Sequence, residues 1–109
     1  MLFRSELGSD NLELAYALTG LGLSYLADNN ATAALVPLER AFKIRSTKEK
    51  EPSRRAETAF GLARALWDSH RDRVRARDLA ERARTDYGRT PAASKVADIE
   101  RWLKEREPS

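Results

Sequence analysis

The stretch from Leu21 to Phe42, LGLSYLADNNATAALVPLERAF, decides the fold class. Its second half places small or apolar residues at Ala34, Leu38 and Ala41, the spacing of one face of an α-helix. Its first half has the same helical periodicity, and only the polar turn Asp-Asn-Asn separates the two halves. Two amphipathic segments joined by so short a turn predict an antiparallel pair of helices.

The same pattern returns 42 positions later, from position 34 to position 76. A fixed period of this length is the mark of stacked supersecondary units. Such arrays build extended binding surfaces rather than catalytic clefts. We therefore expect two stacked helical hairpins. The matched residues are Ala34 with Ala76, Leu38 with Ala80, Ala41 with Ala83, Tyr25 with Trp67, and Leu18 with Phe60.

Polar residues that can cap helices mark the boundaries of five expected helices. Asp10, Asn30, Ser53, Asp72 and Thr90 each stand before a helical pattern. No segment alternates with period two, so no strand is predicted. The expected fold class is all-α, an α-solenoid fragment of two antiparallel helix hairpins plus a C-terminal capping helix. Its expected segments are residues 1–9 as the tail of a preceding repeat or linker, 10–45 as the first hairpin, 46–52 as a loop, 53–88 as the second hairpin, 89–106 as the capping helix and 107–109 as a tail.

Two glycines, Gly20 and Gly22, fall inside the first expected helix. Each costs roughly 1 kcal/mol there relative to alanine, so close approach of a neighbouring helix is the expected reason for both. They do not form a phosphate-binding loop, because they do not lie between a strand and a helix. The buried face of this helix is expected to carry Leu14, Leu18 and Leu21.

The residues Leu21-Gly22, Tyr25, Ala34 and Leu38 resemble the signature of one tetratricopeptide (TPR) repeat. The second unit departs from that signature at one place, where Arg64 stands instead of glycine. The 42-residue spacing resembles the longer variant of the repeat found in kinesin light chains. The second unit matches at Phe60, Ala63, Trp67, Ala76, Ala80 and Ala83.

The run from Val36 to Ala41 also resembles TPR arrays attached to some bacterial serine/threonine kinases. The resemblance implies a bacterial scaffold or adaptor module for protein–protein interaction, with no enzymatic activity of its own. By the repeat spacing, Leu2 and Phe3 correspond to Ile44 and Arg45, so we expect the C-terminal end of a longer array. In that case the first helix exposes an apolar face that an upstream hairpin would cover, formed by residues such as Leu12, Tyr16 and Leu23.

In TPR arrays the first helix of each hairpin lines a concave groove, and the resemblance implies the same here. The implied surface is mostly apolar and small, which favours an apolar peptide or helix as the partner. The lysine and asparagine set with which some co-chaperones clamp a peptide carboxylate is absent at these positions, which argues against chaperone tails. The implied groove residues are Tyr16, Thr19, Leu23, Leu26, Thr58, Gly61, Ala65 and Asp68.

No catalytic, cofactor or metal site is predicted. The chain has no cysteine, which excludes thiolate chemistry and cysteine-ligated metals. Its one histidine, His70, lies in an expected turn, and no recognisable motif supplies a nucleophile or metal ligand beside it. No apolar run approaches the roughly 18–20 residues that span a bilayer. A cytoplasmic protein that does not cross a membrane is therefore expected.

Two alternatives to partner binding stay open. One is self-association, in which the exposed end or the groove pairs two copies into a homo-oligomer. The other is weak binding of nucleic acid or another anion by the fourth expected helix, where Arg73 and Arg77 share a face. Nucleic acid is the less favoured partner, because nucleic-acid readers usually carry a stronger basic stripe. Concentration-dependent size tests the first alternative, and salt-sensitive binding tests the second.

Overall fold

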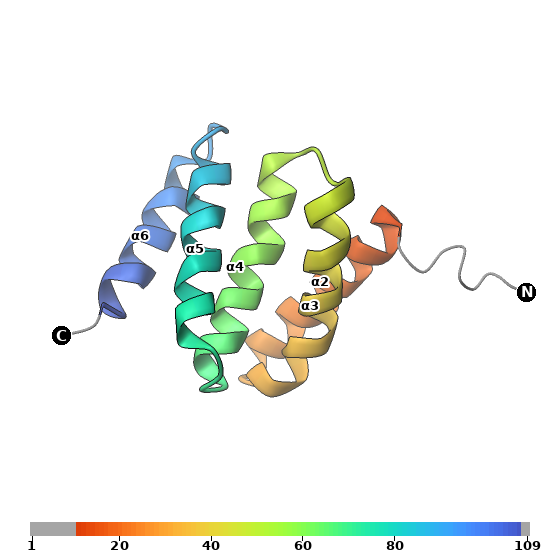
Figure 1. Cartoon of the computed structure of the whole chain (residues 1–109), viewed down its shortest axis with the longest axis horizontal. Coiled ribbons are helices and arrows are strands. Elements are labelled where there is room, and N and C mark those ends of the chain that lie inside the picture. The colour runs from red at the N-terminus through yellow and green to blue at the C-terminus, as the bar shows by residue number, and fades with distance from the viewer. Residues whose placement is uncertain (1–10, 108–109) are drawn as a thin grey trace, which may run out of the picture.

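A computed structural model describes residues 11–107, and every regular element in that range is a helix. Short turns pair α2 with α3 and α4 with α5, α3 packs on α4, and α6 packs on α5 (Figure 1). The protein is therefore all-α, with two antiparallel hairpins followed by a last helix, as predicted. The helices are α2 (Leu12–Ala27), α3 (Ala31–Lys48), α4 (Pro52–Asp68), α5 (Arg73–Tyr87) and α6 (Ala93–Glu105).

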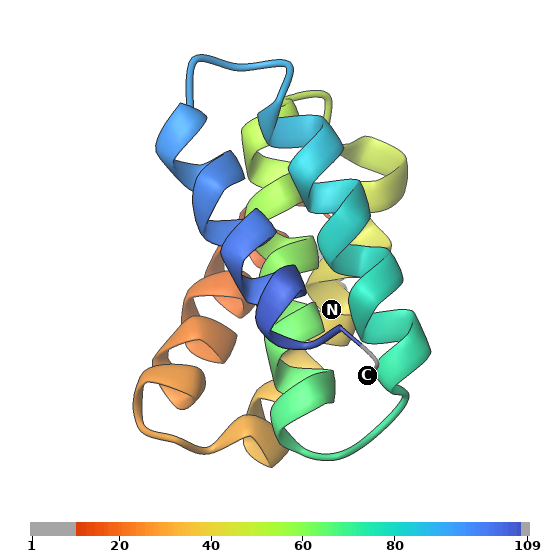
Figure 2. The same ribbon diagram turned by 90° about the vertical axis from the view of Figure 1, so that its left-hand side faces the viewer.

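The helices follow one another along the long axis of the molecule, from α2 at one end to α6 at the other (Figure 1). The view along that axis shows α2 and α6 toward one side of α4, and α3 and α5 toward the other (Figure 2). The first helices of the two hairpins touch directly, because α2 also packs on α4. This arrangement leaves one face of α4 between α2 and α6.

The two hairpin turns are built alike. Asn29 (φ 59°) and His70 (φ 60°) hold the left-handed conformation that lets a helix reverse direction within a few residues. The next helix is then capped by Asn30 or Asp72, whose side chains accept from the amide three residues further on, at 3.2 and 3.0 Å. Both predicted caps are confirmed, and His70 serves as a turn residue.

The second helix is longer than predicted. The sequence indicated an end near Arg45 and a loop over 46–52, but α3 continues to Lys48. The hydroxyls of Ser46 and Thr47 donate to backbone carbonyls of the preceding turn, so these polar residues are accommodated within the helix. The connection to α4 therefore shrinks to 49–51.

Two other predicted N-caps are wrong in position. Helix α4 begins at Pro52 rather than after Ser53. Proline suits the first turn of a helix because its backbone nitrogen carries no hydrogen that would need an acceptor. Helix α6 begins at Ala93, and the hydroxyl of Thr90 instead accepts from the amide of Ala92 at 3.1 Å. At the start of α2 the cap is Asn11, since Asp10 lies outside the described residues.

The core confirms the 42-residue repeat. The equivalent alanines and leucine of the second helix in each hairpin are fully buried. Tyr25 and Trp67, which also correspond, pack partly buried against this core. One part of the prediction is wrong: Leu21 is exposed, and α2 instead buries Ala15, Thr19 and Gly22. The residues with 0% exposure at matched positions are Ala34, Leu38, Ala41, Ala76, Ala80 and Ala83.

The two glycines of α2 have different roles. A Cβ atom on Gly22 would lie 2.3 Å from Cγ of Leu38, so α3 approaches α2 more closely than any side chain allows. A Cβ atom on Gly20 would meet nothing within 4 Å. Close helix packing therefore explains Gly22, as expected, and does not explain Gly20.

We expect Gly20→Ala to raise the free energy of unfolding by about 0.5–1 kcal/mol, because alanine restricts the unfolded chain and fits the open space. Urea denaturation of the two proteins measures the difference. A lower stability in the variant would contradict the open environment of Gly20.

The second hairpin solves the same packing problem with different residues. Arg64 and Ala80 stand 42 positions after Gly22 and Leu38. The first hairpin thus has its large residue on α3, and the second has it on α4. With alanine in place of leucine, the second helix no longer needs a glycine opposite it. The departure from the repeat thus frees position 64 to carry a long side chain.

Candidate functional site

Residues of α2, α4, α5 and α6 line a groove of about 580 Å³. Figure 2 shows the ribbon of α4 between those of α2 and α6. Ligand sites in proteins typically have volumes of roughly 300–1,000 Å³. The lining is mixed, with apolar side chains between charged ones. The apolar residues include Leu23, Phe60 and Ile99, the basic ones are Arg54, Arg64 and Lys95, and the acidic ones are Glu57 and Asp98.

The charges that line the groove are not balanced. Asp98 pairs with Arg101 at 3.4 Å, so an arginine outside the groove compensates this acid. Glu57 lies 3.4 Å from Arg45, a cation that it shares with the buried carboxylate of Glu49. The three basic residues of the groove form no ion pair with any residue in 11–107. The groove therefore carries uncompensated positive charge along α4 and α6.

Arg64 is the most enclosed of these cations. Its guanidinium lies over the ring of Phe60, 5.0 Å from the centroid, and its Nε is buried without a hydrogen-bond partner among the described residues, as are the Nε atoms of Arg45 and Arg106. Burial lowers the pKa of the Arg64 guanidinium. Electrostatic interactions with Asp68 and Tyr87 act in the opposite direction and raise that pKa. An arginine nevertheless stays protonated at neutral pH.

Arg64 differs in this respect from the other arginines of the described chain that are buried or half-buried. Each of the others donates hydrogen bonds to a carboxylate or a carbonyl, which offsets the loss of water. Arg64 makes no hydrogen bond and no ion pair with residues 11–107. The arginines that do are Arg45, Arg55, Arg75, Arg77, Arg84 and Arg106.

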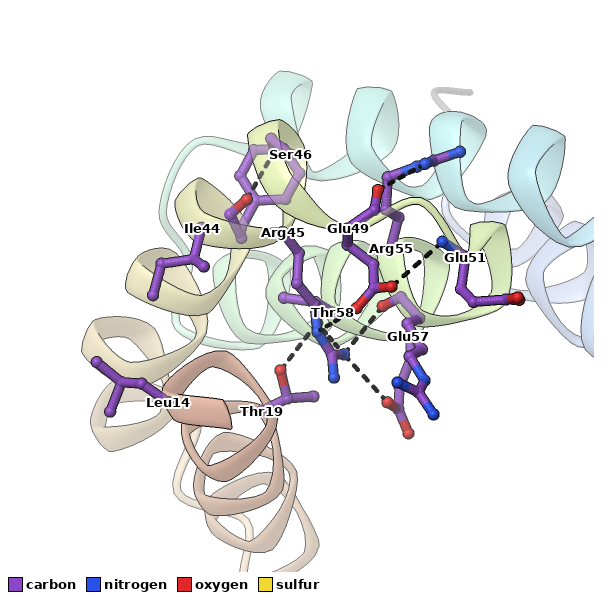
Figure 3. Close-up of polar contacts among 12 residues, drawn as sticks. Leu14, Thr19, Ile44, Arg45, Ser46, Glu49, Glu51, Arg55, Glu57 and Thr58 are labelled. Carbon is purple, nitrogen blue, oxygen red and sulfur yellow. Dashed lines mark hydrogen bonds and ion pairs between the residues drawn. The ribbon is translucent and has the colours of Figure 1, made fainter. Parts of the chain in front are cut away.

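Arg45 is a buried arginine whose Nη1, unlike the guanidinium of Arg64, has hydrogen-bond partners (Figure 3). Its side chain is 2% exposed, and its Nη1 donates to the hydroxyl of Thr58 at 2.9 Å and to the carbonyl of Arg54 at 3.0 Å. The carboxylate of Glu49 lies 3.8 Å from its Nε. The hydroxyl of Thr58 also bonds that of Thr19 at 2.8 Å, so the cluster joins α2, α3 and α4. Its role is structural.

Only one of the eight predicted groove residues lines this groove. Leu23 does so, and it reaches α4 because Gly61 leaves room for it, with only 3.0 Å between a Cβ on Gly61 and Cδ2 of Leu23. The direct contact of α2 with α4 buries four of the other predicted residues. Thr19, Thr58, Gly61 and Ala65 are buried, Leu26 packs against the core, and Tyr16 and Asp68 are exposed outside the groove lining.

The groove lies one face further round α4 than the resemblance implied, along Glu57, Phe60 and Arg64. One signal in the sequence pointed there. Arg64 replaces the small residue that the repeat places at this position, and a long charged side chain cannot occupy a close helix contact. The pairing of Glu57 with Arg45, however, depends on a contact between helices that no local pattern reveals.

Arg73 and Arg77 do not form a shared anion patch. Arg77 donates to two carbonyls at the end of α6, at 2.9 and 3.1 Å, so its guanidinium caps that helix. Arg73 lies over the ring of Trp67, 4.5 Å from the centroid, and donates to Nδ1 of His70. Arg77 is thus occupied within the fold, and the expected pair leaves only Arg73 facing solvent.

Glu39 and Arg75 link the two hairpins from α3 to α5. The two Nη atoms of Arg75 donate to the two carboxylate oxygens of Glu39 at 2.8 and 2.7 Å. These hydrogen bonds hold the pKa of Glu39 below its usual value, although partial burial acts in the opposite direction. The pair is therefore a pH-dependent contribution to stability.

We expect Glu39→Gln to lower the free energy of unfolding at pH 7 by less than about 1 kcal/mol, since both side chains are well exposed. Because the folded pKa is lowered, this contribution is present above the unfolded value of about 4.3. It is lost as the pH falls through the folded pKa, so the two proteins should converge in acid. Thermal unfolding at pH 7 and at pH 3 measures the convergence, and an unchanged difference would contradict it.

Other kinds of site are not seen in the described part of the chain. No three side chains of histidine, aspartate or glutamate within 11–107 come together as metal ligands would. None of the helices α2 to α6 combines the length and the apolar character that crossing a bilayer requires.

Comparison of the chain with family models, with curated proteins and with solved structures finds no match in any of the three.

Proposed function

We propose that this chain is a protein–protein interaction module that holds a segment of its partner in the groove between α2, α4 and α6. The observation that carries the proposal is the groove itself, in which Leu23, Phe60 and Ile99 lie among uncompensated basic side chains. Apolar contacts fix a bound segment in such a surface, and the charges select its sequence.

The likeness of the two hairpins to TPR repeats supports the same function. In the proposal, the chain forms part of a scaffold or adaptor, and a cytoplasmic location remains a prediction. We assign no catalysis to the groove, since neither histidine nor cysteine lines it and both of its carboxylates are paired with arginines. These residues suit recognition of a partner better than proton transfer.

Selection of random twelve-residue peptides displayed on phage, with the purified chain as target, tests the proposal. We expect binders that shift the amide NMR signals of the groove residues of α4 and α6, which are Ser53, Arg54, Glu57, Phe60, Arg64, Lys95, Asp98 and Ile99. Signals on the outer faces of α3 and α5 should stay in place. No enriched peptide, or shifts confined to α3 and α5, would contradict the proposed function.

Self-association is a second candidate, and the outer face of α2 favours it. Tyr16 is 71% exposed, whereas Thr58, its equivalent in α4, is fully buried. Leu21 is likewise exposed, and its equivalent Ala63 is buried. The helices that cover this face of α4 have no counterpart over α2 within the described residues. A second copy of the chain could cover it.

Light scattering after size exclusion, over a concentration series, tests this second candidate. We expect a dimer that grows with concentration and is abolished by Tyr16→Asp. Val36→Asp is the matched control, because Val36 is also highly exposed but lies on α3. A monomer at every concentration would remove the candidate and leave partner binding in the groove untouched.

A further inference from the structure

We infer that the groove selects a partner segment by its acidic side chains, and that Arg64 is the residue that receives the first of them. The inference rests on the proposed function, and it names the chemistry of the partner. Three observations lead to it: Arg64 makes no hydrogen bond or ion pair with residues 11–107, basic residues are in excess in the groove, and they are spread along α4.

The first observation concerns Arg64 alone. Its guanidinium contacts the face of Phe60 and makes no hydrogen bond with residues 11–107, while the other enclosed arginines donate to carboxylates or carbonyls. A carboxylate presents two oxygens in the geometry that a guanidinium recognises with paired hydrogen bonds. A bound aspartate or glutamate would therefore accept two hydrogen bonds from Arg64, as Glu39 does from Arg75.

The second observation is the sign of the charge. Three basic residues and two acidic ones line the groove. Asp98 is paired with Arg101 outside it, whereas Glu57 shares Arg45 with Glu49, so the basic residues remain in excess. Arg54 and Lys95 add their charges to that of Arg64, and none of the three forms an ion pair with described residues. A basic, partly apolar groove is complementary to a segment that alternates acidic and apolar side chains.

The third observation is the spacing of the basic residues along α4. Arg54 and Arg64 are separated by ten positions in α4, which at 1.5 Å per residue is about 15 Å. An extended peptide covers this length in about four to five residues. We therefore expect two acidic residues about four positions apart, with apolar residues between them.

Nucleic acid is the less suitable occupant of the same groove. Phosphate backbones are usually met by several basic residues spread along a surface, with aromatic faces free for stacking. Here Phe60 packs edge-on against Trp102, with ring centroids 5.5 Å apart, and Arg64 covers it. The aromatic ring is thus already in use, and a peptide fits better.

The test uses peptides fused to the phage coat protein through their C-termini, so that only side-chain carboxylates are available. The targets are the wild-type chain, Arg64→Gln, Arg64→Lys and the control Arg71→Gln. Arg71 is exposed and lies outside the groove lining, so its substitution removes the same charge elsewhere. Circular dichroism and thermal unfolding confirm that each variant folds.

We expect wild-type selections to be enriched in aspartate or glutamate, and selections against Arg64→Gln to lose that enrichment. Replacing the acidic residue of a selected peptide by its amide should weaken binding to the wild type about tenfold or more. The same peptide change should have little effect on Arg64→Gln, and Arg64→Lys should fall between the two proteins. Arg71→Gln should bind within about twofold of the wild type, because a surface charge outside the site contributes little.

Other results would overturn the inference. Enriched peptides without acidic residues would show that the groove binds a segment but does not select it by charge, which leaves the proposed function standing. If replacing the acidic residue of the peptide by its amide left the affinity for the wild type unchanged, the inference would also be wrong and the proposed function would stand. This comparison needs no protein variant. No enrichment on any target, together with Arg64-dependent binding of a labelled 20-nucleotide single strand, would overturn both the inference and the proposed function.

Discussion

Arg45→Met is expected to lower the free energy of unfolding by about 3–5 kcal/mol, the usual cost of removing one partner from a buried ion pair. Methionine keeps the apolar stem but leaves Glu49, whose side chain is only 7% exposed, without its cation. Thr58 and the carbonyl of Arg54 also lose their donor. A domain of this size is stabilised by about 5–15 kcal/mol, so the loss should be evident in urea denaturation.

The double variant Arg45→Met with Glu49→Gln is the control for this prediction. With no buried charge left, it should recover about 0.5–3 kcal/mol relative to the sum of the single losses. A loss below about 1 kcal/mol in Arg45→Met alone would mean that water reaches the cluster and that its burial is not important.

Gly22→Ala is expected to destabilise the first hairpin by about 1–3 kcal/mol, because the new methyl group overlaps the side chain of Leu38. Leu38→Ala removes a fully buried side chain and should cost about 2–5 kcal/mol. In the double variant the added methyl group enters the space that leucine leaves. Its total loss should therefore be smaller than the sum by about 0.5–3 kcal/mol.

Urea denaturation of the four proteins completes this cycle, with Gly20→Ala as the matched glycine in the same helix. Strict additivity would contradict the close contact between Gly22 and Leu38. Equal effects at Gly20 and Gly22 would mean that helix propensity, rather than packing, governs both positions.

Local patterns predicted the core of each hairpin well. The spacing of Ala34, Leu38 and Ala41 and its return 42 positions later identified residues that are fully buried. The turn caps Asn30 and Asp72 were also predictable, because a cap acts on an amide only three residues away. These features depend on neighbours along the chain, and so the sequence reveals them.

The features that were missed depend on how helices pack on one another. Helix α2 is apolar on more than one side, and periodicity alone cannot show that Thr19 is buried and Leu21 exposed. The expected groove followed from the resemblance to TPR arrays, and it includes residues on the face of α4 that contacts α2. Arg45 was not predicted to be buried, because an arginine is enclosed only when partners such as Glu49 surround it.

The two hairpins carry different residues at equivalent positions of their helix pairs. The charge of the groove can therefore be changed without changing the fold. Gly22 lies against Leu38 in the first hairpin, and the second hairpin has Arg64 and Ala80 at the equivalent positions. A variant with Arg64→Gly and Ala80→Leu should keep its helical fold and lose the Arg64 cation of the groove. It should then no longer bind acidic segments. Conversely, in a designed array with arginine and alanine at these two positions of every unit, each repeat should have one cation available to bind an acidic side chain.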